Sequence, residues 1–151
     1  MKVVLDKGAV MPTRAHPWDA GLDLYAPEET IVPPVGAEII GGYLYASYTV
    51  GSATIDTGVH VEIPEGYVGL ILPKSGLNVN NGLTCDGVID AHYTGSIKVK
   101  LYNNSEKAHY FQAGDKIAQL VILPCLLPEL ELTEKLGETD RGDNGFGSTG
   151  R

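Results

Sequence analysis

The residue best suited to chemistry in this chain is a carboxylate at the end of an apolar stretch. Asp90 directly follows Gly87-Val88-Ile89 and precedes Tyr93 by three residues. A carboxylate held at the mouth of an apolar sheet can serve as a general base, although a lone Asp often caps a turn instead. His92 competes for the role of base, but strand alternation points it away from the neighbours of Asp90. We therefore expect a surface histidine at 92 and a candidate base at 90.

Three further segments carry polar groups that could contribute to a binding site. Pro73-Lys74-Ser75-Gly76-Leu77 offers a cation, a hydroxyl and a glycine where a buried strand ends, and such groups bind phosphate through side chain and backbone together. The same pattern is also common in ordinary turns. Gln119 interrupts the apolar run 117–123, and Asp23 lies inside the apolar segment 22–25. A buried amide or charge needs a partner, so each is either a structural contact or a ligand contact.

The last eleven residues, 141–151, are rich in glycine and hold one aromatic side chain, Phe146. Such a segment cannot bury a core of its own. Phe146 offers a stacking face, Arg141 offers a bidentate fork for phosphate, and Gly147-Ser148-Thr149 offers an anion-binding nest. Taken alone, the segment could also be a frayed terminus without a function.

Composition limits the class of protein. A chain of 151 residues with 43% hydrophobic content fits one globular domain. The formal net charge of −8 argues against a general nucleic-acid binder, and no apolar run is long enough to cross a membrane.

Cys85 and Cys125 lack a close pairing and predict reduced thiols in a cytosolic protein. The four histidines lack metal-ligand spacing, so no protein-caged zinc site is expected.

The periodicity of the chain indicates β-structure almost throughout. Residues 96–102 alternate apolar and polar, and 68–72 and 117–123 are short apolar runs between turn signals. Residues 57–61 and 22–25 are shorter candidates, and no helical period exceeds one or two turns. These features predict an all-β fold: a single-domain, jelly-roll-like barrel or sandwich with little helix and a flexible glycine-rich C-terminal tail.

Two segments modify this plan. Residues 37–51 are expected to form an extra hairpin, in which the tyrosines pack or line an edge rather than stack on bases. Large apolar residues end near Gly137. We therefore expect a β domain over 1–136 and a lid segment over 137–151.

In this order, the segments resemble the five motifs of the trimeric deoxyuridine triphosphatases (dUTPases). The motifs are A-G-L-D-L-Y at 20–25, P-K-S-G-L at 73–77, G-V-I-D-A-H-Y-T-G at 87–95, G-D-K-I-A-Q-L at 114–120 and R-G-D-N-G-F-G-S-T-G at 141–150. The resemblance implies hydrolysis of dUTP to dUMP and pyrophosphate by water attack on the α-phosphorus, assisted by Mg²⁺. It also implies a cytoplasmic homotrimer with shared active sites, no membrane and no direct nucleic-acid partner.

The resemblance also implies roles for individual residues. Asp90 would activate the water, Tyr93 would exclude a ribose 2′-hydroxyl, and Asp23 would steady water on the magnesium–triphosphate complex without binding the metal directly. A hairpin at 82–87, including Gly87, would read the uracil edge. The remaining expected contacts to phosphate or base are Lys74, Ser75, Gly76, Gln119, Arg141, Phe146, Gly147, Ser148 and Thr149.

Two departures and two alternatives accompany the resemblance. The second motif usually carries Arg, whereas Lys74 is a point charge that cannot form a bidentate fork. Residues 37–53 are longer than expected and could carry a partner surface. A dCTP deaminase is an alternative, but it would need a Glu in the third motif, where 87–90 has none. A non-catalytic or moonlighting nucleotide-sensing regulator is the other.

Overall fold

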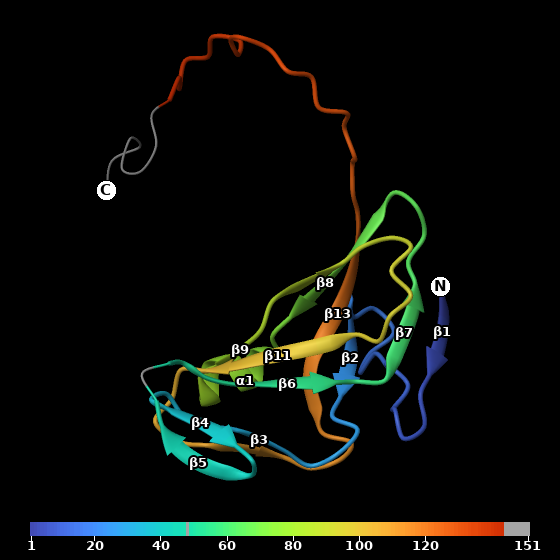
Figure 1. Cartoon of the computed structure of the whole chain (residues 1–151). Coiled ribbons are helices and arrows are strands. Elements are labelled where there is room, and N and C mark those ends of the chain that lie inside the picture. Colours follow the sequence, from blue (N-terminus) through green and yellow to red (C-terminus); the bar gives the residue numbers. More distant parts are fainter. Residues whose placement is uncertain (48, 144–151) are drawn as a thin grey trace.

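The structure is a computed structural model that describes residues 1–47 and 49–143. Within these residues it is built from short strands and a single helix, and Figure 1 shows the strands packed into one body from which the C-terminal segment extends. The elements are β1 (Lys2–Leu5), β2 (Gly21–Tyr25), β3 (Thr30–Val32), β4 (Ala37–Ile40), β5 (Tyr43–Ala46), β6 (Gly51–Asp56), β7 (Val59–Glu62), β8 (Tyr67–Leu72), α1 (Ser75–Asn81), β9 (Leu83–Thr84), β10 (Gly87–Ile89), β11 (Lys98–Asn103), β12 (His109–Phe111) and β13 (Lys116–Pro124).

Two open sheets hold most of the strands. One has the order β10-β8-β13-β2 and the other the order β6-β11-β9, while three further pairs (β1-β7, β12-β3 and β4-β5) complete the described part of the fold. All the pairings are antiparallel. The described strands do not close into a barrel, and the all-β, jelly-roll-like expectation is confirmed.

The hydrophobic core follows the alternation of the sequence. On β11, Val99 and Leu101 are buried while Lys98 and Lys100 are exposed, and Ile97 just before the strand is buried as well. This is the face that the sequence predicted, because successive side chains of a strand point to opposite sides. In β13 the consecutive residues Ile117 and Ala118 are both buried, which fits the shift in register between Lys116 and Ala118.

Helix α1 is a difference from the expected loop after β8. It spans Ser75–Asn81 and ends at Gly82, whose φ of 68° places it in the left-handed region that favours glycine. No residue of α1 is buried, and the Val79 side chain is 80% exposed. The helix therefore has no apolar face from which periodicity could have revealed it.

The segment 82–87 is not the hairpin that the sequence suggested. Strand β9 pairs with β11 in one sheet, whereas β10 pairs with β8 in the other. The chain between them crosses from sheet to sheet, and Cys85 is buried on the way. Burial raises the pKa of the Cys85 thiol to about 11, with the nearby Asp86 carboxylate adding to the shift.

The extra hairpin is present and is formed by β4 and β5. Its register pairs Ala37 with Ala46 and Ile40 with Tyr43. Gly41 and Gly42 form the turn with φ values of 57° and 84°, a left-handed pair that suits a two-residue hairpin loop. The Tyr43 side chain is 73% exposed, so the hairpin projects its aromatic residues outward.

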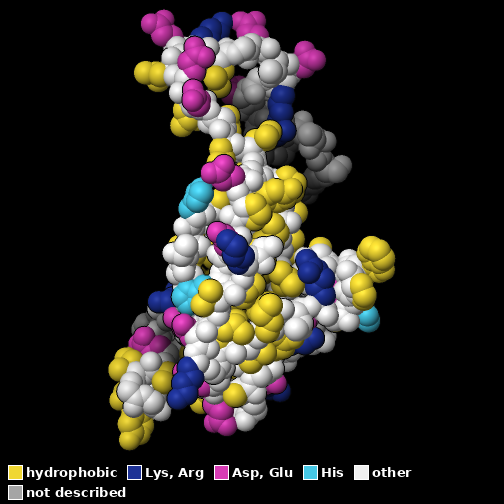
Figure 2. Space-filling view, turned by 90° about the vertical axis from the view of Figure 1, so that its right-hand side faces the viewer, with side chains coloured by type: hydrophobic (Ala, Val, Ile, Leu, Met, Phe, Trp, Pro, Cys, Tyr) yellow, Lys and Arg dark blue, Asp and Glu magenta, His cyan; other side chains and the backbone are white. Residues whose placement is uncertain are grey.

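The body ends where β13 ends. The Cys125 amide donates to the Gly66 carbonyl at 2.8 Å, and the side chains from Leu126 to Asp143 are exposed. The large apolar residues among them are Leu126, Leu127, Leu130, Leu132 and Leu136. Figure 2 shows hydrophobic side chains along this segment and on the body below it. Among the described residues, no helix has the length and apolar character to span a membrane.

Candidate active site

Asp90 lies immediately after β10, at the start of the loop 90–97 that leads to β11. Ile89 pairs with Gly69 of β8, which fixes where the loop leaves the sheet. The Asp90 carbonyl accepts a hydrogen bond from the Tyr93 amide at 3.2 Å, so the chain turns at once and the side chain stays exposed. A pocket of about 390 Å³ is lined by Asp90 and by residues 65–68, which lead into β8. An exposed carboxylate that lines a pocket is open to water, so Asp90 remains a candidate general base.

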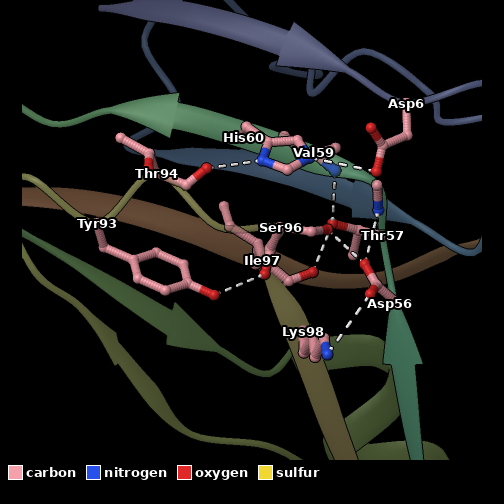
Figure 3. Close-up of polar contacts among 11 residues, drawn as sticks. Asp6, Asp56, Thr57, Val59, His60, Tyr93, Thr94, Ser96, Ile97 and Lys98 are labelled. Atoms are coloured by element: carbon pink, nitrogen blue, oxygen red, sulfur yellow. Dashed lines mark hydrogen bonds and ion pairs between the residues drawn. The ribbon is translucent and has the colours of Figure 1, made fainter.

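Tyr93 folds back on its own loop. Its hydroxyl donates to the Ser96 carbonyl at 3.1 Å, as Figure 3 shows. A Cβ at Gly95 would lie 2.4 Å from the Tyr93 hydroxyl, so the ring occupies the space that any larger residue at 95 would need. The ring is thus fixed in direction by a hydrogen bond and by contact with the backbone. His92 is exposed, as expected, with a φ of 68°.

Two of the candidate phosphate ligands, Lys74 and Gln119, meet at a second pocket, of about 400 Å³, whose lining also includes Gly21 and Asp23. The Gln119 amide donates to the Pro73 carbonyl at 3.1 Å. Its side chain lies over Gly21, where an added Cβ would come within 2.1 Å of Oε1. The glycine therefore makes room for the amide, and the amide is oriented by the end of β8.

Asp23 is the only acidic residue that is buried in the described part of the chain, with 6% of its surface exposed. One carboxylate oxygen binds the Lys74 ammonium, and the other lies 2.7 Å from Nζ of Lys116. Burial acts to raise the pKa of Asp23, but hydrogen bonds from Lys116 and Lys74 outweigh it and hold that pKa below its ordinary value. The carboxylate is therefore charged and compensated, as a buried charge must be.

The remaining described candidates are placed around these two pockets. Ser75 and Gly76 begin α1 and are exposed, with open space around the position of a Gly76 Cβ. Gly87 begins β10 and packs next to Ile71. Arg141 is exposed in the C-terminal segment. Phe146, Gly147, Ser148 and Thr149 lie outside the described residues.

The structure does not bring the candidate base and the candidate phosphate ligands together within one chain. Asp90 follows Ile89, which pairs with Gly69 in the first half of β8. Gln119 pairs with Leu72, the last residue of β8, two positions before Lys74. Asp90 is level with Val68, four residues from Leu72, so the separation along the sheet is roughly 13 Å, because a strand rises by about 3.3 Å per residue. Within one chain the candidate residues therefore form two separate groups, a candidate Asp90 half-site and a candidate Lys74 half-site.

No group of three or more His, Cys, Asp or Glu side chains suited to a metal ion occurs within residues 1–47 and 49–143. The single buried carboxylate, Asp23, has both oxygens engaged by lysines. Each oxygen keeps a second lone pair and can still accept a hydrogen bond from water. Asp23 can therefore contact a water molecule on a metal ion that is bound by another ligand. It does not, with its neighbours, provide a set of protein ligands for the ion itself.

Two functional neighbours were missed by sequence reasoning. Lys116 binds Asp23 only because the register of β13 on β2 places Lys116 opposite Tyr25, and no spacing in the sequence reveals that register. His60 on β7 contacts the loop that carries Asp90. It lies between two apolar residues of an ordinary strand pattern, which gives no signal of such a contact.

Comparison with known proteins gives a consistent result. The dUTPase family model matches residues 7–150. The deoxyuridine 5′-triphosphate nucleotidohydrolase of Corynebacterium glutamicum is 42% identical, over 100% of this chain and 95% of that protein. The one of Debaryomyces hansenii is 38% identical, over 96% and 83% respectively.

Solved structures agree in fold. The dUTPase of Staphylococcus bacteriophage 80alpha with dUPNHPP has a TM-score of 0.83 and 32% identity, with 99% of this chain and 98% of that chain covered. A mutant dUTPase from phage phi11 of S. aureus, described with a structural Mg(II) ion, has a TM-score of 0.73 and 31% identity, over 89% and 96%.

Proposed function

This chain belongs to the dUTPase family, and from that premise we propose how its residues carry out the reaction. The protein is a dUTP diphosphatase, which hydrolyses dUTP to dUMP and pyrophosphate. Such hydrolysis limits uracil incorporation into DNA and supplies dUMP for thymidylate synthesis. The site residues, the metal ion, the assembly and the location are the parts that we infer.

Asp90 is the general base. Its carboxylate takes a proton from water, the water oxygen forms a bond to the α-phosphorus, and the bond from that phosphorus to the leaving pyrophosphate oxygen breaks. The position of Asp90 at the end of β10, exposed beside a pocket, supports this role. General-base catalysis supplies roughly 10²–10⁴-fold, so positioning and electrostatic stabilisation of the phosphoryl oxygens supply the rest.

The phosphates bind at the pocket of Lys74 and Gln119. Lys74 offers a cation beside Asp23, Gln119 offers an oriented amide, and Ser75 and Gly76 offer a hydroxyl and an uncrowded backbone at the start of α1. A magnesium ion chelated by the triphosphate neutralises charge on the phosphoryl oxygens when it is bound. Asp23 would accept hydrogen bonds from water around that ion, which fits the two free lone pairs of its carboxylate.

Two segments would select the substrate: the loop 90–97, which carries Tyr93, and the segment 82–87, which crosses from one sheet to the other. The Tyr93 ring, held by Ser96, would pack against the deoxyribose and leave no room for a 2′-hydroxyl. The backbone from 82 to Gly87 would read the uracil edge and exclude the thymine methyl. Measuring pyrophosphate release from dUTP, UTP and dTTP tests both readings. Ammonia release from dCTP would instead indicate a deaminase.

We propose that the active protein is a homotrimer with shared sites. The main support is that the Asp90 half-site and the Lys74 half-site lie at opposite ends of β8. A second support is the exposed row of leucines from 126 to 136, which a neighbouring chain could cover. The free thiols of Cys85 and Cys125 suit a cytoplasmic location.

Mixing two inactive variants tests the shared site directly. Asp90→Asn lacks the base and Lys74→Ala lacks the cation, so each alone should hydrolyse dUTP slowly. If the two half-sites of one active site come from different chains, subunits exchanged between the variants in equal amounts should recover about a quarter of wild-type turnover. No recovery after exchange would contradict the shared site, and full activity of Asp90→Asn alone would remove Asp90 from the role of base.

The C-terminal segment would act as the lid. Arg141 would grip phosphate, Phe146 would stack on uracil, and Gly147, Ser148 and Thr149 would hold the terminal phosphate. The glycine content supports this role, because such backbone can wrap a ligand closely once binding offsets its ordering entropy.

A regulatory function alongside catalysis is the second candidate. The β4–β5 hairpin supports it, because Ile40, Tyr43 and Leu44 are exposed at its tip, where large apolar residues often mark a contact with another protein. Deleting residues 38–45 should leave dUTP hydrolysis intact if the hairpin serves only such a contact.

A further inference from the structure

The loop that carries Asp90 and Tyr93 is held by a histidine outside the five motifs. On β7, Nδ1 of His60 lies 2.8 Å from the Thr94 carbonyl oxygen. Nε2 of the same ring lies 3.2 Å from Oδ2 of Asp6, in the turn after β1. Figure 3 shows the imidazole between these two partners. Because Thr94 directly follows Tyr93, His60 holds the loop one residue from the proposed sugar gate.

Both partners of the ring can only accept hydrogen bonds. A carbonyl oxygen has no proton to give, and neither has an ionised carboxylate. Each ring nitrogen must therefore carry a hydrogen, and only the imidazolium has both. The hydrogen bond to the Thr94 carbonyl and the one to Asp6 raise the pKa of His60 above its ordinary value. A neutral ring carries one N–H and can keep only one of the two hydrogen bonds.

The charges around the ring favour the same protonation state. Lys2 is ion-paired with Glu62 at 2.8 Å, and Lys98 lies 3.8 Å from Asp56, so each nearby cation already faces a carboxylate. The charged groups that act on His60 are Asp6 and Asp56, and Lys2 and Glu62 line the same pocket as its ring.

The rest of the loop is anchored without a titrating ring. The Ser96 hydroxyl donates to Asp56, and the hydroxyl of Thr57 donates to the Ile97 carbonyl at 2.7 Å. These contacts hold the end of the loop that leads to β11 (Figure 3). At Thr94, by contrast, His60 is the side chain that binds the backbone. The section nearest Tyr93 is therefore the section that depends on the protonation of His60.

We propose that His60, as an imidazolium bound to Asp6, is a positioning residue for dUTP hydrolysis that fixes the Tyr93–Thr94 section of the catalytic loop. The proposal rests on the function proposed above, in which Tyr93 rejects the ribose 2′-hydroxyl. A loop held at Thr94 keeps the Tyr93 ring in place and preserves discrimination between dUTP and UTP. A loop released at Thr94 lets the ring move and admits UTP.

The test is the ratio of kcat/KM for dUTP to kcat/KM for UTP, measured from about pH 6 to about pH 9, the range in which histidine titrates. Effects of pH on the shared chemistry cancel in this ratio. In the wild-type protein we expect the ratio to fall about three- to tenfold as pH rises, the factor that one hydrogen bond supplies.

Two substitutions should remove this pH dependence in opposite ways. In His60→Gln the single amide nitrogen should donate to the charged Asp6 carboxylate, the stronger acceptor, which leaves the Thr94 carbonyl without a donor, so the ratio should be low at every pH. In Asp6→Asn the new amide can donate to a neutral Nε2 while Nδ1 still donates to Thr94, so the ratio should stay high. His109→Gln is the matched control, because the His109 ring packs on Phe111 of β12 instead.

Wild-type values and pH dependence in His60→Gln would overturn the proposal, as would a fall in Asp6→Asn equal to that of the wild type. If His60→Gln does not fold, NMR can measure the protonation state of the two ring nitrogens of His60 in the wild-type protein. Two protonated nitrogens at about pH 6 would support the proposal, and a neutral ring would overturn it. Failure of the underlying function is distinct, because the wild-type protein would then fail to prefer dUTP over UTP at any pH.

Discussion

Replacing Gly21 with alanine should disable the phosphate pocket through one side chain. The added Cβ would lie 2.1 Å from Oε1 of Gln119, and ordinary contact begins near 3.4 Å, so the amide must move by more than 1 Å. The movement breaks the hydrogen bond from Gln119 to the Pro73 carbonyl, which is worth about 1 kcal/mol. A displacement of this size at a positioning group can cost up to about 10²-fold in rate.

The expected result for Gly21→Ala is therefore a fall in kcat/KM for dUTP of about five- to hundredfold, with a small loss of thermal stability. Steady-state kinetics and a melting curve measure the two effects. The matched background is Gln119→Ala, in which the clashing amide is absent. Adding Gly21→Ala to that background should change kcat/KM by less than about twofold.

The comparison refutes the reasoning if Gly21→Ala costs as much in the Gln119→Ala background as in the wild type. The alanine would then act through the strand itself rather than through the amide. A normal rate for Gly21→Ala alone would show that Gln119 is not oriented by its place above Gly21.

Three further predictions concern the lid, the buried carboxylate and the buried thiol. Deleting 141–151 should abolish most dUTP turnover and leave the assembly folded, as size-exclusion chromatography and circular dichroism would report; full activity would end the lid hypothesis. Because the pKa of Asp23 is lower when folded, its contribution to stability is present above its unfolded pKa and is lost as pH falls through the folded value. Acid unfolding of Asp23→Asn should therefore show a weaker dependence on pH over that range, and an identical dependence would argue against the two lysine contacts. Cys85, with a pKa of about 11, should resist alkylation at about pH 8 until the protein unfolds, whereas Cys125 should react sooner; equal rates in the native protein would contradict the burial of Cys85.

The sequence predicted those features that depend on local alternation or on turn residues. Ile97, Val99 and Leu101 share one buried side because they alternate with polar residues, and the two glycines at 41–42 fit the hairpin turn that the structure contains. Helix α1 could not be predicted in this way, because Val79 points to solvent and no apolar face repeats along it.

The content of the candidate site was predictable, but its geometry was not. Motif order identified Asp90, Lys74 and Gln119 as candidates, yet nothing in that order reveals that Asp90 and Lys74 lie at opposite ends of one strand. The ion pair between Lys116 and Asp23 depends on strand register. The hydrogen bond between His60 and the Thr94 carbonyl joins residues that are 34 positions apart. Such relations arise only when the chain has folded.

The placement of two half-sites on one strand has a mechanical consequence. In an assembly with shared sites, one end of β8 serves one reaction centre and the other end serves its neighbour. The strand is hydrogen-bonded on both sides, to β10 and to β13, which restrains its movement relative to the rest of the sheet. If the sites are shared as proposed, a displacement of Lys74 by a bound triphosphate would be passed along β8, within a single protomer, to the Asp90 that serves the next molecule of dUTP.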